Sequence, residues 1–418
     1  MNNHPDPVIE TLKEHVSISN LDDIYNIRYK KQPEDGDITQ VWAFGLQPGG
    51  KLGYYIGLDW VDKKEPLVFY VTPKIEGLDY YRMFAECLES PKTRPFMDSV
   101  YDIRFEKPFI KPPAENCCDI LSFLMYHYIL VLSKVMQKPL MKGYVSYQEN
   151  LRAKVKGKIV LSSHLQHNVF GMRPDRMMCR YDEFSRDCVE NRLLHSAYHI
   201  CRSYLTRVHG SRRFLRIVNF GTIDHVFSDI GFIGNVQELH RIRCNPLYRD
   251  YSEALRLAML IYRYHFYHET QEQDSIHRRI PPYIIDMSKL FELYVLLQIS
   301  KAGIDVNYQP KGKYGAADFI DAKNKVIIDA KYKTTYSTHY NIDDIRQVSG
   351  YARDKALLKI MGLESDDEKD IVRNCLIVYP DVSALPDFPV TYLEMMEPIT
   401  QFHRIFQLGI HLPVQGAT

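Results

Sequence analysis

Two aspartates and a lysine near the C-terminal end of the chain are the residues best suited to chemistry. Asp318 precedes a Phe-Ile pair, and Asp329 and Lys331 form an Asp-Ala-Lys sequence. Carboxylate oxygens are the ligands that hard divalent cations prefer. A cation bound by two carboxylates activates water and stabilises the negative charge that develops during phosphodiester hydrolysis. We therefore expect a Mg²⁺ site, also suited to Mn²⁺, with Asp318 and Asp329 as ligands and with Lys331 orienting or helping to deprotonate the water.

A β-hairpin is the element that must position these three side chains. Two short apolar runs flank the turn-forming residues 321–324, Asp-Ala-Lys-Asn, which favour a tight connection between antiparallel strands. Side chains of a strand point alternately to opposite faces, so Asp329 and Lys331 share one face. The other face is expected to be the buried one and carries Val326, Ile328 and Ala330. The hairpin should bring Asp318 beside Asp329, whereas the alternative is a solvated hairpin with its charges facing water.

Neighbouring segments supply further polar side chains. Glu292 is an acid in an otherwise apolar helical stretch, where we expect a further catalytic metal ligand or, alternatively, an ordinary helix-surface acid. Gln347 and Tyr351 are four residues apart and therefore share one face of a helix. We expect them to contact DNA phosphate together with Lys333, and the alternative for the helical pair is ordinary packing.

Taken in sequence order, the candidate residues described above resemble the motif of the PD-(D/E)xK nuclease superfamily. Its pattern comprises a helix acid, a first strand acid, an Asp-x-Lys strand and a Gln-x-x-x-Tyr helix. The sequence departs from this pattern at Ala317, where the superfamily has proline. The resemblance implies that the matching residues form one catalytic and metal-binding set: Glu292, Asp318, Asp329 and Lys331.

Two segments outside the hairpin narrow the resemblance to the McrC family. The segment from Leu151 to Ile159 is similar to the basic segment of that family, and the segment from Cys179 to Arg192 is similar to its helix-entry signature. The resemblance covers the chain from Tyr144 to Tyr379. It implies the nuclease subunit of an McrBC-type, 5-methylcytosine-specific restriction system, which cuts double-stranded DNA and defends the cell against foreign DNA.

The same resemblance implies a partner protein. McrC-type subunits work with an AAA+ GTPase, the McrB-like subunit, which forms a hexameric ring, recognises DNA and translocates it, and whose GTP hydrolysis they stimulate. The chain contains no Gly-x-x-x-x-Gly-Lys-Ser/Thr loop, so we do not expect it to be the motor itself. Two other hypotheses remain: a nonenzymatic adaptor that activates the GTPase, and a stand-alone DNA repair nuclease.

A basic segment in the middle of the chain is a second candidate contact surface. Four basic residues occupy every second position: Arg152, Lys154, Lys156 and Lys158. In a continuous strand they share one face, and the intervening apolar residues are expected to pack on the core. The sequence therefore predicts a strand over residues 151–161 whose basic face contacts DNA phosphates or an acidic surface of the GTPase. The alternative is a solvated strand face.

Length and pattern together predict an α+β protein of several domains. A chain of 418 residues is too long for one core. Alternating apolar residues and turn signals predict a β-rich domain over residues 1–112, which the resemblance assigns to partner docking. Its strands are expected at residues 41–44, 54–56 and 67–71. Periodic apolar positions predict a mainly helical middle region with the basic strand over residues 113–280, and an α/β order predicts the PD-(D/E)xK endonuclease domain over residues 281–418.

Composition excludes several other classes of protein. The 45% hydrophobic and 25% charged residues are typical of a globular protein, and a formal charge of +1 means that any DNA-binding surface depends on local segregation of charge. The 8 cysteines include no Cys-x-x-Cys pair, which favours a reducing, cytoplasmic location over a disulfide framework. The most apolar stretch, residues 120–135, is too short to span a membrane and is expected to be a buried helix.

Overall fold

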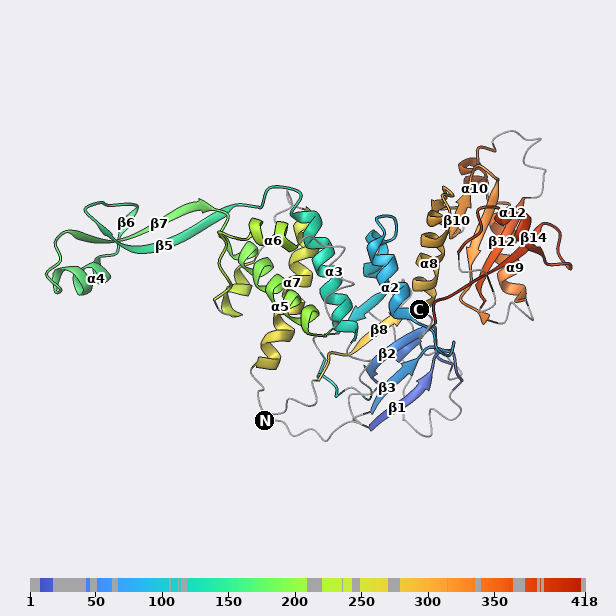
Figure 1. The fold of residues 1–418 in the computed structure, drawn as a ribbon, viewed down its shortest axis with the longest axis horizontal. Helices are drawn as coiled ribbons and strands as arrows, with labels where there is room; N and C mark the ends of the chain where they lie inside the picture. The colour runs from blue at the N-terminus through green and yellow to red at the C-terminus, as the bar shows by residue number, and fades with distance from the viewer. Residues whose placement is uncertain are drawn as a thin grey trace. The chain divides into compact units, whose positions relative to one another are not determined.

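The structure is a computed structural model of the chain. It describes residues 8–17, 43–45, 51–61, 67–104, 107–111, 113, 119–208, 220–234, 236–242, 249–269, 279–313, 315–334, 340–363, 373–381, 384 and 387–414. The chain packs as two compact units, residues 1–117 with 279–418, and residues 118–278, and each is described by itself (Figure 1). The described residues form a mixed α/β structure with several sheets, as the sequence predicts. None of their helices is both long and apolar enough to cross a membrane.

A five-stranded sheet forms the N-terminal part of the first unit, in the order β1-β3-β2-β8-β4. Its strands are β1 (Val8–Lys13), β2 (Tyr55–Trp60), β3 (Leu67–Thr72), β4 (Tyr101–Ile103) and β8 (Tyr283–Asp286). β1 is parallel to β3, and the other pairs are antiparallel. In the sequence, helix α2 (Tyr80–Glu89) and the 3-10 turn Arg94–Ser99 follow β3 and precede β4. The expected strands near residues 54–56 and 67–71 are confirmed, because their apolar side chains fill a buried layer that includes Phe69 and Val71.

The strand expected at residues 41–44 is wrong in its described part, and residues 41 and 42 lie outside the described residues. Ala43–Gly45 form a 3-10 turn, with Phe44 in the left-handed region at a φ of 60°. The Phe44 side chain is 1% exposed and belongs to the same core cluster as Phe69. Burial of one large ring therefore overrides a local pattern that favours a strand.

Strand β8 belongs to the N-terminal sheet although it follows the second unit in sequence. It pairs with β2 on one side and β4 on the other, and Ile284 and Ile285 are both buried. The sequence boundary at residue 281 assigned this strand to the C-terminal domain, because a short apolar run does not reveal its sheet. Helix α8 (Met287–Lys301) begins directly after β8, and the Asp286 carboxylate caps it by accepting a hydrogen bond from the Lys289 N–H at 2.9 Å.

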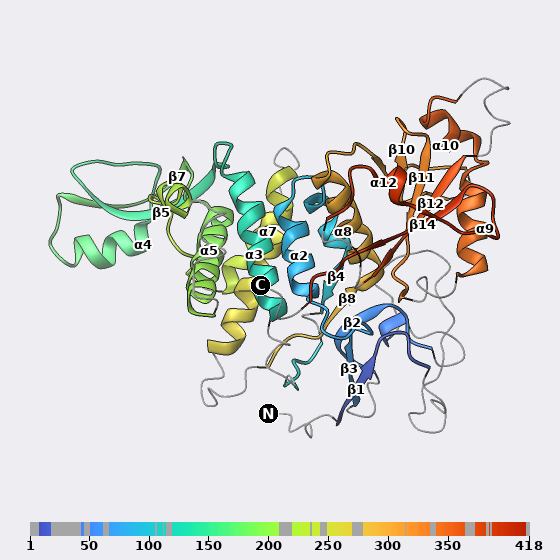
Figure 2. The ribbon, with the colours of Figure 1, turned by 45° about the vertical axis from the view of Figure 1, so that its right-hand side comes forward.

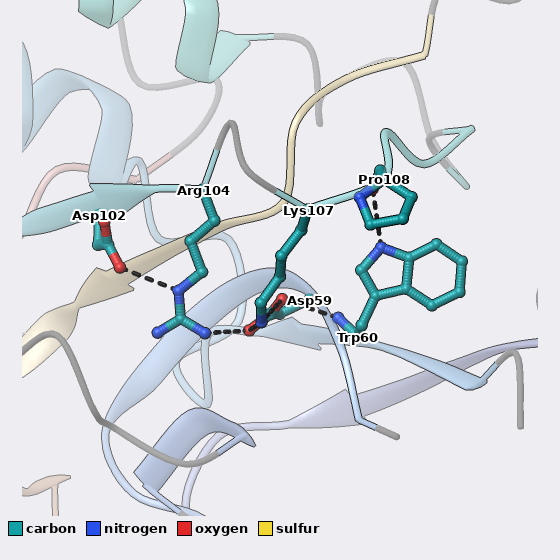
Figure 3. Close-up of polar contacts among 6 residues, drawn as sticks. All are labelled: Asp59, Trp60, Asp102, Arg104, Lys107 and Pro108. Carbon is teal, nitrogen blue, oxygen red and sulfur yellow. Dashed lines mark hydrogen bonds and ion pairs between the residues drawn. The ribbon is translucent and has the colours of Figure 1, made fainter. Parts of the chain in front are cut away.

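A buried ion cluster is attached to strand β2 (Figure 3). Asp59 is 1% exposed, and its carboxylate oxygens lie 2.5 Å from Arg104 Nη1 and 2.7 Å from Lys107 Nζ. Asp102 also contacts the Arg104 guanidinium, at 2.9 Å, and the indole N–H of Trp60 donates to the Pro108 carbonyl at 2.8 Å. Because Asp59 contacts two cations at once, its loss leaves both of them undercompensated in a buried site.

Asp59→Ala should therefore lower the free energy of unfolding by about 3 kcal/mol, measured by urea denaturation of the full chain. The control is Lys13→Ala, which breaks an ion pair whose side chains are 52% and 87% exposed and which should have little effect. A loss below about 1 kcal/mol for Asp59→Ala would show that the cluster does not stabilise the sheet.

Three long helices form the centre of the second unit. They are α3 (Asp119–Val135), α5 (Val189–Val208) and α7 (Arg249–Glu269), accompanied by α6 (Phe220–Val226) and the 3-10 turn Val236–Arg241. Helices α3, α5 and α7 contact one another, and Leu193, Ala197 and Cys201, spaced by four on α5, are fully buried. The helix expected over residues 120–135 is thereby confirmed.

A long β-hairpin extends from these helices (Figures 1 and 2). Strands β5 (Gly143–Arg152) and β7 (Arg176–Ser185) pair antiparallel along their whole length, and the short β6 (Lys158–Ile159) also pairs with β7. Helix α4 (Leu161–His164) and the π-helical turn Leu165–Val169 lie between β6 and β7. Strand β7 was not expected from the sequence, because a ribbon that is largely exposed has no apolar face to mark it.

The single strand expected over residues 151–161 is wrong. Strand β5 ends at Arg152, and Ala153 and Gly157 have left-handed φ values of 53° and 68°. A Cβ at Gly157 would lie 2.4 Å from the Arg180 carbonyl oxygen, so the crossing of this loop over β7 requires glycine. The four basic side chains are all exposed, but they do not share one strand face. Val155, expected on the core, is 55% exposed.

A six-stranded sheet forms the C-terminal part of the first unit, in the order β13-β14-β12-β11-β10-β9. Its strands are β9 (Asn307–Tyr308), β10 (Phe319–Asp321), β11 (Val326–Ala330), β12 (Asn374–Pro380), β13 (Glu397–Pro398) and β14 (Ile405–Ile410). Strands β10 and β11 are antiparallel, with Phe319 opposite Ile328, so the predicted hairpin is confirmed. β11 is parallel to β12, and β12 to β14.

Helices pack on this sheet around the hairpin. Helix α8 and helix α9 (Ile342–Tyr351) both contact β11, and α10 (Lys355–Ile360) and α12 (Tyr392–Met395) follow in sequence. Ile327 and Ile328 point to opposite faces of β11, and both are 0% exposed. The expectation that only one face of β11 is buried is therefore wrong, and Asp329 lies in a covered position rather than on a solvated strand face.

Candidate active site

The hairpin brings Asp318 and Asp329 to the same end of strands β10 and β11. Asp318 comes directly before β10, is half-buried, and accepts a hydrogen bond at 2.7 Å from the backbone N–H of Ala330 on β11. Asp329 is 1% exposed. The bond across the hairpin fixes the Asp318 side chain beside β11, as the strand pairing predicted from the sequence requires.

Burial and mutual repulsion govern the charge of these acids. Burial raises the pKa of Asp318 well above its ordinary value, and the negative charges of Asp329 and Glu292 raise this pKa further. Burial also raises the pKa of Asp329, while Lys331 acts in the opposite direction. Acids that repel one another in a buried site are stabilised in their charged form by a cation, and such perturbed groups are typical of functional sites.

Lys331 connects the carboxylates to helix α9. Its Nζ lies 2.8 Å from Asp329 Oδ2 and donates a hydrogen bond at 2.8 Å to Gln347 Oε1. Gln347 Nε2 in turn donates to the Tyr351 hydroxyl at 2.7 Å, so the two helix residues share one face as predicted. Burial lowers the pKa of Lys331, but the charge and hydrogen bond of Asp329, together with the charges of Asp318 and Asp344, outweigh burial and leave this pKa raised. Lys331 is therefore held as an ammonium group.

Glu292 lies on α8 and already has two partners. Lys289 Nζ lies 2.9 and 2.8 Å from its two oxygens, and Gln309 Nε2 donates to Oε1 at 3.0 Å. Among the residues that the structure describes, Glu292, Asp318 and Asp329 do not each place an oxygen within 4.8 Å of the others. The structure thus brings Asp318, Asp329 and Lys331 to one end of the hairpin, and Glu292 is held by Lys289 and Gln309.

Lys333, expected to contact DNA, is paired within the protein. Its Nζ lies 2.9 and 2.7 Å from the two oxygens of Asp344, in the first turn of α9. The site also contains three residues that were not expected from the sequence: Asp344, Lys289 and Gln309. Lys289 could have been found, because it precedes Glu292 by three residues on one helix face. Gln309 could not have been found from the sequence, because only the pairing of β9 with β10 brings it near Glu292.

A comparison with protein families identifies the chain. The family model described as "McrBC 5-methylcytosine restriction system component" matches residues 96–355, more than half of the 418 residues. The chain belongs to this McrBC family. The match confirms the family resemblance found in the sequence, and the matched range includes all four candidate catalytic residues, Glu292, Asp318, Asp329 and Lys331.

Two solved assemblies from Thermococcus gammatolerans are similar to this McrBC family member. One is a refined half-complex from a tetradecameric assembly of McrB AAA+ hexamers with bound McrC. The two chains are 16% identical, the match covers 98% of this chain and 96% of that chain, and the TM-score is 0.42. The other is the McrBC complex: 15% identity, 72% of this chain and 90% of that chain, TM-score 0.30. These likenesses are distant, and the family assignment rests on the family model. The search of curated proteins found no match.

The residues of this McrBC family member fit a hard divalent cation. The candidate ligands at the site offer carboxylate oxygens, which Mg²⁺ prefers. Asp329 Oδ2 is buried and accepts no hydrogen bond of normal geometry, although Lys331 Nζ lies 2.8 Å away. A carboxylate oxygen has more than one acceptor position, so Asp329 Oδ2 can bind a metal ion in addition to its ion pair with Lys331.

Proposed function

We propose that the chain is a Mg²⁺-dependent DNA endonuclease, the nuclease subunit of a two-component restriction system that acts against foreign, including methylated, DNA. One observation carries the proposal: the half-buried carboxylate of Asp318 and the buried carboxylate of Asp329 lie at the same end of the hairpin, beside the charged Lys331. Membership of the McrBC family supports it independently.

The chemistry follows from the positions of these side chains. Asp318 and Asp329 would hold Mg²⁺, and the bound ion would supply an activated water and stabilisation of the charge on the leaving oxygen. Lys331 Nζ, 2.8 Å from Asp329 Oδ2, is placed to orient or help deprotonate the attacking water or to donate to a phosphate oxygen. Gln347 fixes the direction of the lysine side chain, and Tyr351 fixes Gln347. Lys333 can contact DNA only when its pair with Asp344 opens.

The proposed partners are double-stranded DNA and a McrB-like AAA+ GTPase in a hexameric ring. Family membership supports the GTPase partner. In the proposal, the GTPase recognises and translocates DNA, and this chain stimulates GTP hydrolysis and makes the cut. The N-terminal sheet and the hairpin of β5 and β7 are the candidate docking elements.

Purified chain with and without its GTPase partner should be assayed on methylated and unmethylated DNA with GTP and Mg²⁺. The proposal expects cutting only by the complex. GTPase stimulation without any cutting would instead identify a nonenzymatic adaptor, and cutting that needs neither partner nor GTP would identify a stand-alone repair nuclease. A chain that neither cuts nor stimulates would refute the proposal.

The basic segment that follows β5 gives a separate prediction. Arg152 pairs with Asp175, and Lys156 pairs with Glu183, within the hairpin. Both residues are nevertheless exposed, as are Lys154 and Lys158. The triple variant Lys154→Glu, Lys156→Glu and Lys158→Glu should weaken DNA binding about tenfold or more and flatten its salt dependence if the segment follows the DNA, because fewer counterions are released. If the segment docks on the GTPase, the variant should lose GTPase stimulation and keep its own DNA binding.

The matched control reverses three other exposed lysines of the same unit, Lys134, Lys138 and Lys142. It makes the same change in net charge but should change neither property. If the hairpin variant retains DNA affinity, salt slope and GTPase stimulation, the basic segment is only a solvated surface.

A further inference from the structure

The segment that carries Lys331 leaves the C-terminal sheet immediately after β11. The Lys331 N–H donates to the Val378 carbonyl at 2.8 Å, and the Lys333 N–H then donates to the Lys331 carbonyl at 2.7 Å, which turns the chain. Tyr332, between the two lysines, is only 3% exposed. Its ring lies 5.7 Å from that of Phe291 and 6.2 Å from that of Tyr54, between centroids. Tyr332, the neighbour of Lys331, is therefore held by residues that do not belong to the C-terminal sheet.

Tyr332 is anchored by polar contacts with Glu14 and Lys74, which follow strands β1 and β3 of the N-terminal sheet. Glu14 follows β1 directly, is 1% exposed, and accepts hydrogen bonds on Oε1 from the Tyr332 hydroxyl at 2.9 Å and from the Lys74 N–H at 3.0 Å. Lys74 Nζ donates to the Tyr332 carbonyl at 2.6 Å and lies 4.0 Å from the centre of the Tyr332 ring. Glu14 and Lys74 thus hold both the side chain and the backbone of Tyr332.

Ordinary core packing does not explain this arrangement. Burial of a carboxylate is costly, and Glu14 Oε2 has no hydrogen-bond partner. Burial accordingly raises the pKa of Glu14. An apolar side chain of similar volume would fill the same space without that cost, whereas a hydrogen-bonded set fixes one geometry. The geometry that is fixed here is that of the residue next to Lys331.

We propose that Glu14 is a positioning residue for the nuclease site: through Tyr332 and Lys74, the N-terminal sheet sets the position of Lys331. The inference rests on the proposed nuclease function. It makes the N-terminal sheet part of the catalytic machinery, in addition to any role in docking a partner. A displacement of about 1 Å in a reacting group is enough to lower a rate substantially, so loss of the anchor should reduce the rate without removing any ligand.

The test compares Glu14→Ala, Glu14→Gln and Tyr332→Phe in the full chain, assembled with its GTPase. We expect Glu14→Ala and Tyr332→Phe to lower the maximal rate of DNA cleavage about tenfold or more, with unchanged DNA affinity and unchanged Mg²⁺ half-saturation. Glu14→Gln keeps an oxygen that can accept from Tyr332 and Lys74, so it should restore most of the rate. The matched control is Glu76→Ala, which removes an exposed acid close to Lys74 and should cleave like the unaltered chain.

Hydrogen exchange of residues 329–334 provides a readout that does not depend on cleavage. We expect faster exchange there in Glu14→Ala and Tyr332→Phe but not in Glu76→Ala. Unaltered cleavage rates in the first two variants, or equal losses in Glu14→Gln and Glu14→Ala, would overturn the inference. If the unaltered complex does not cut DNA at all, the proposed function fails, and unchanged exchange at residues 329–334 would then separately overturn the positioning role.

Discussion

Asp329→Ala should lower the maximal rate of DNA cleavage by the assembled complex at least about a thousandfold, because it removes a proposed metal ligand whose contribution is made in the transition state. Lys331→Ala should have a loss of similar size, since the ammonium group that orients the water or the phosphate is gone. Single-turnover cleavage of a labelled duplex, with protein in excess, measures this rate directly. GTPase stimulation should remain intact in both variants, because the side chains of Asp329 and Lys331 are only 1% and 17% exposed.

Stability separates loss of chemistry from loss of fold in these variants. Removal of the Asp329 carboxylate leaves the Lys331 ammonium group without its partner at 2.8 Å, so the thermal midpoint of each variant must be measured beside its cleavage rate. Asp343→Ala and Arg346→Ala are matched controls, because they remove an exposed acid and an exposed base from the first turns of neighbouring helix α9. Cleavage at the unaltered rate by Asp329→Ala and Lys331→Ala would show that the site lies elsewhere.

Mg²⁺ and Mn²⁺ should support cleavage, and Ca²⁺ should reduce it at least about a hundredfold. Ca²⁺ binds the same oxygen ligands, but with longer bonds and looser geometry, and it activates water poorly. The measurement is the cleavage rate of the complex with each ion in turn, after removal of divalent ions with a chelator and with GTP present.

Two controls make the ion series interpretable. GTP hydrolysis itself depends on a divalent ion, so it must be followed in the same samples. DNA binding in Ca²⁺ should equal that in Mg²⁺, which would show that the defect lies in the chemical step. Equal cleavage rates in Ca²⁺ and Mg²⁺ would contradict the proposed mechanism.

The sequence predicted the parts of the site that depend on local pattern. The apolar runs around residues 321–324 specify a hairpin, and the hairpin alone places Asp318 beside β11. The spacing of Gln347 and Tyr351 likewise specifies a shared helix face, which the structure confirms. Side-chain periods of two and about four residues are properties of the backbone, so these predictions need no knowledge of the tertiary structure.

Features that depend on distant contacts could not be predicted in this way. Glu14 and Tyr332 are 318 residues apart in sequence, and nothing local to either residue indicates the other. The strand predicted for the basic segment was wrong, because an alternating pattern cannot show where a chain turns, and the chain turns at Ala153 and Gly157. The burial of Asp329 was also missed, because the sequence does not show that helices pack on both sides of β11.

The pairing of β4 with β8 has a consequence for the order of assembly. Tyr101 lies opposite Ile285, so the whole second unit is inserted between two strands that are neighbours in one sheet. During synthesis from the N-terminus, residues 118–278 leave the ribosome before β8 is available, and a unit with its own core can fold in that interval. The N-terminal sheet closes only after the insertion is complete, and helix α8, which carries Glu292, follows from that closing strand. The acids of the candidate site therefore come together only late in the synthesis of the chain.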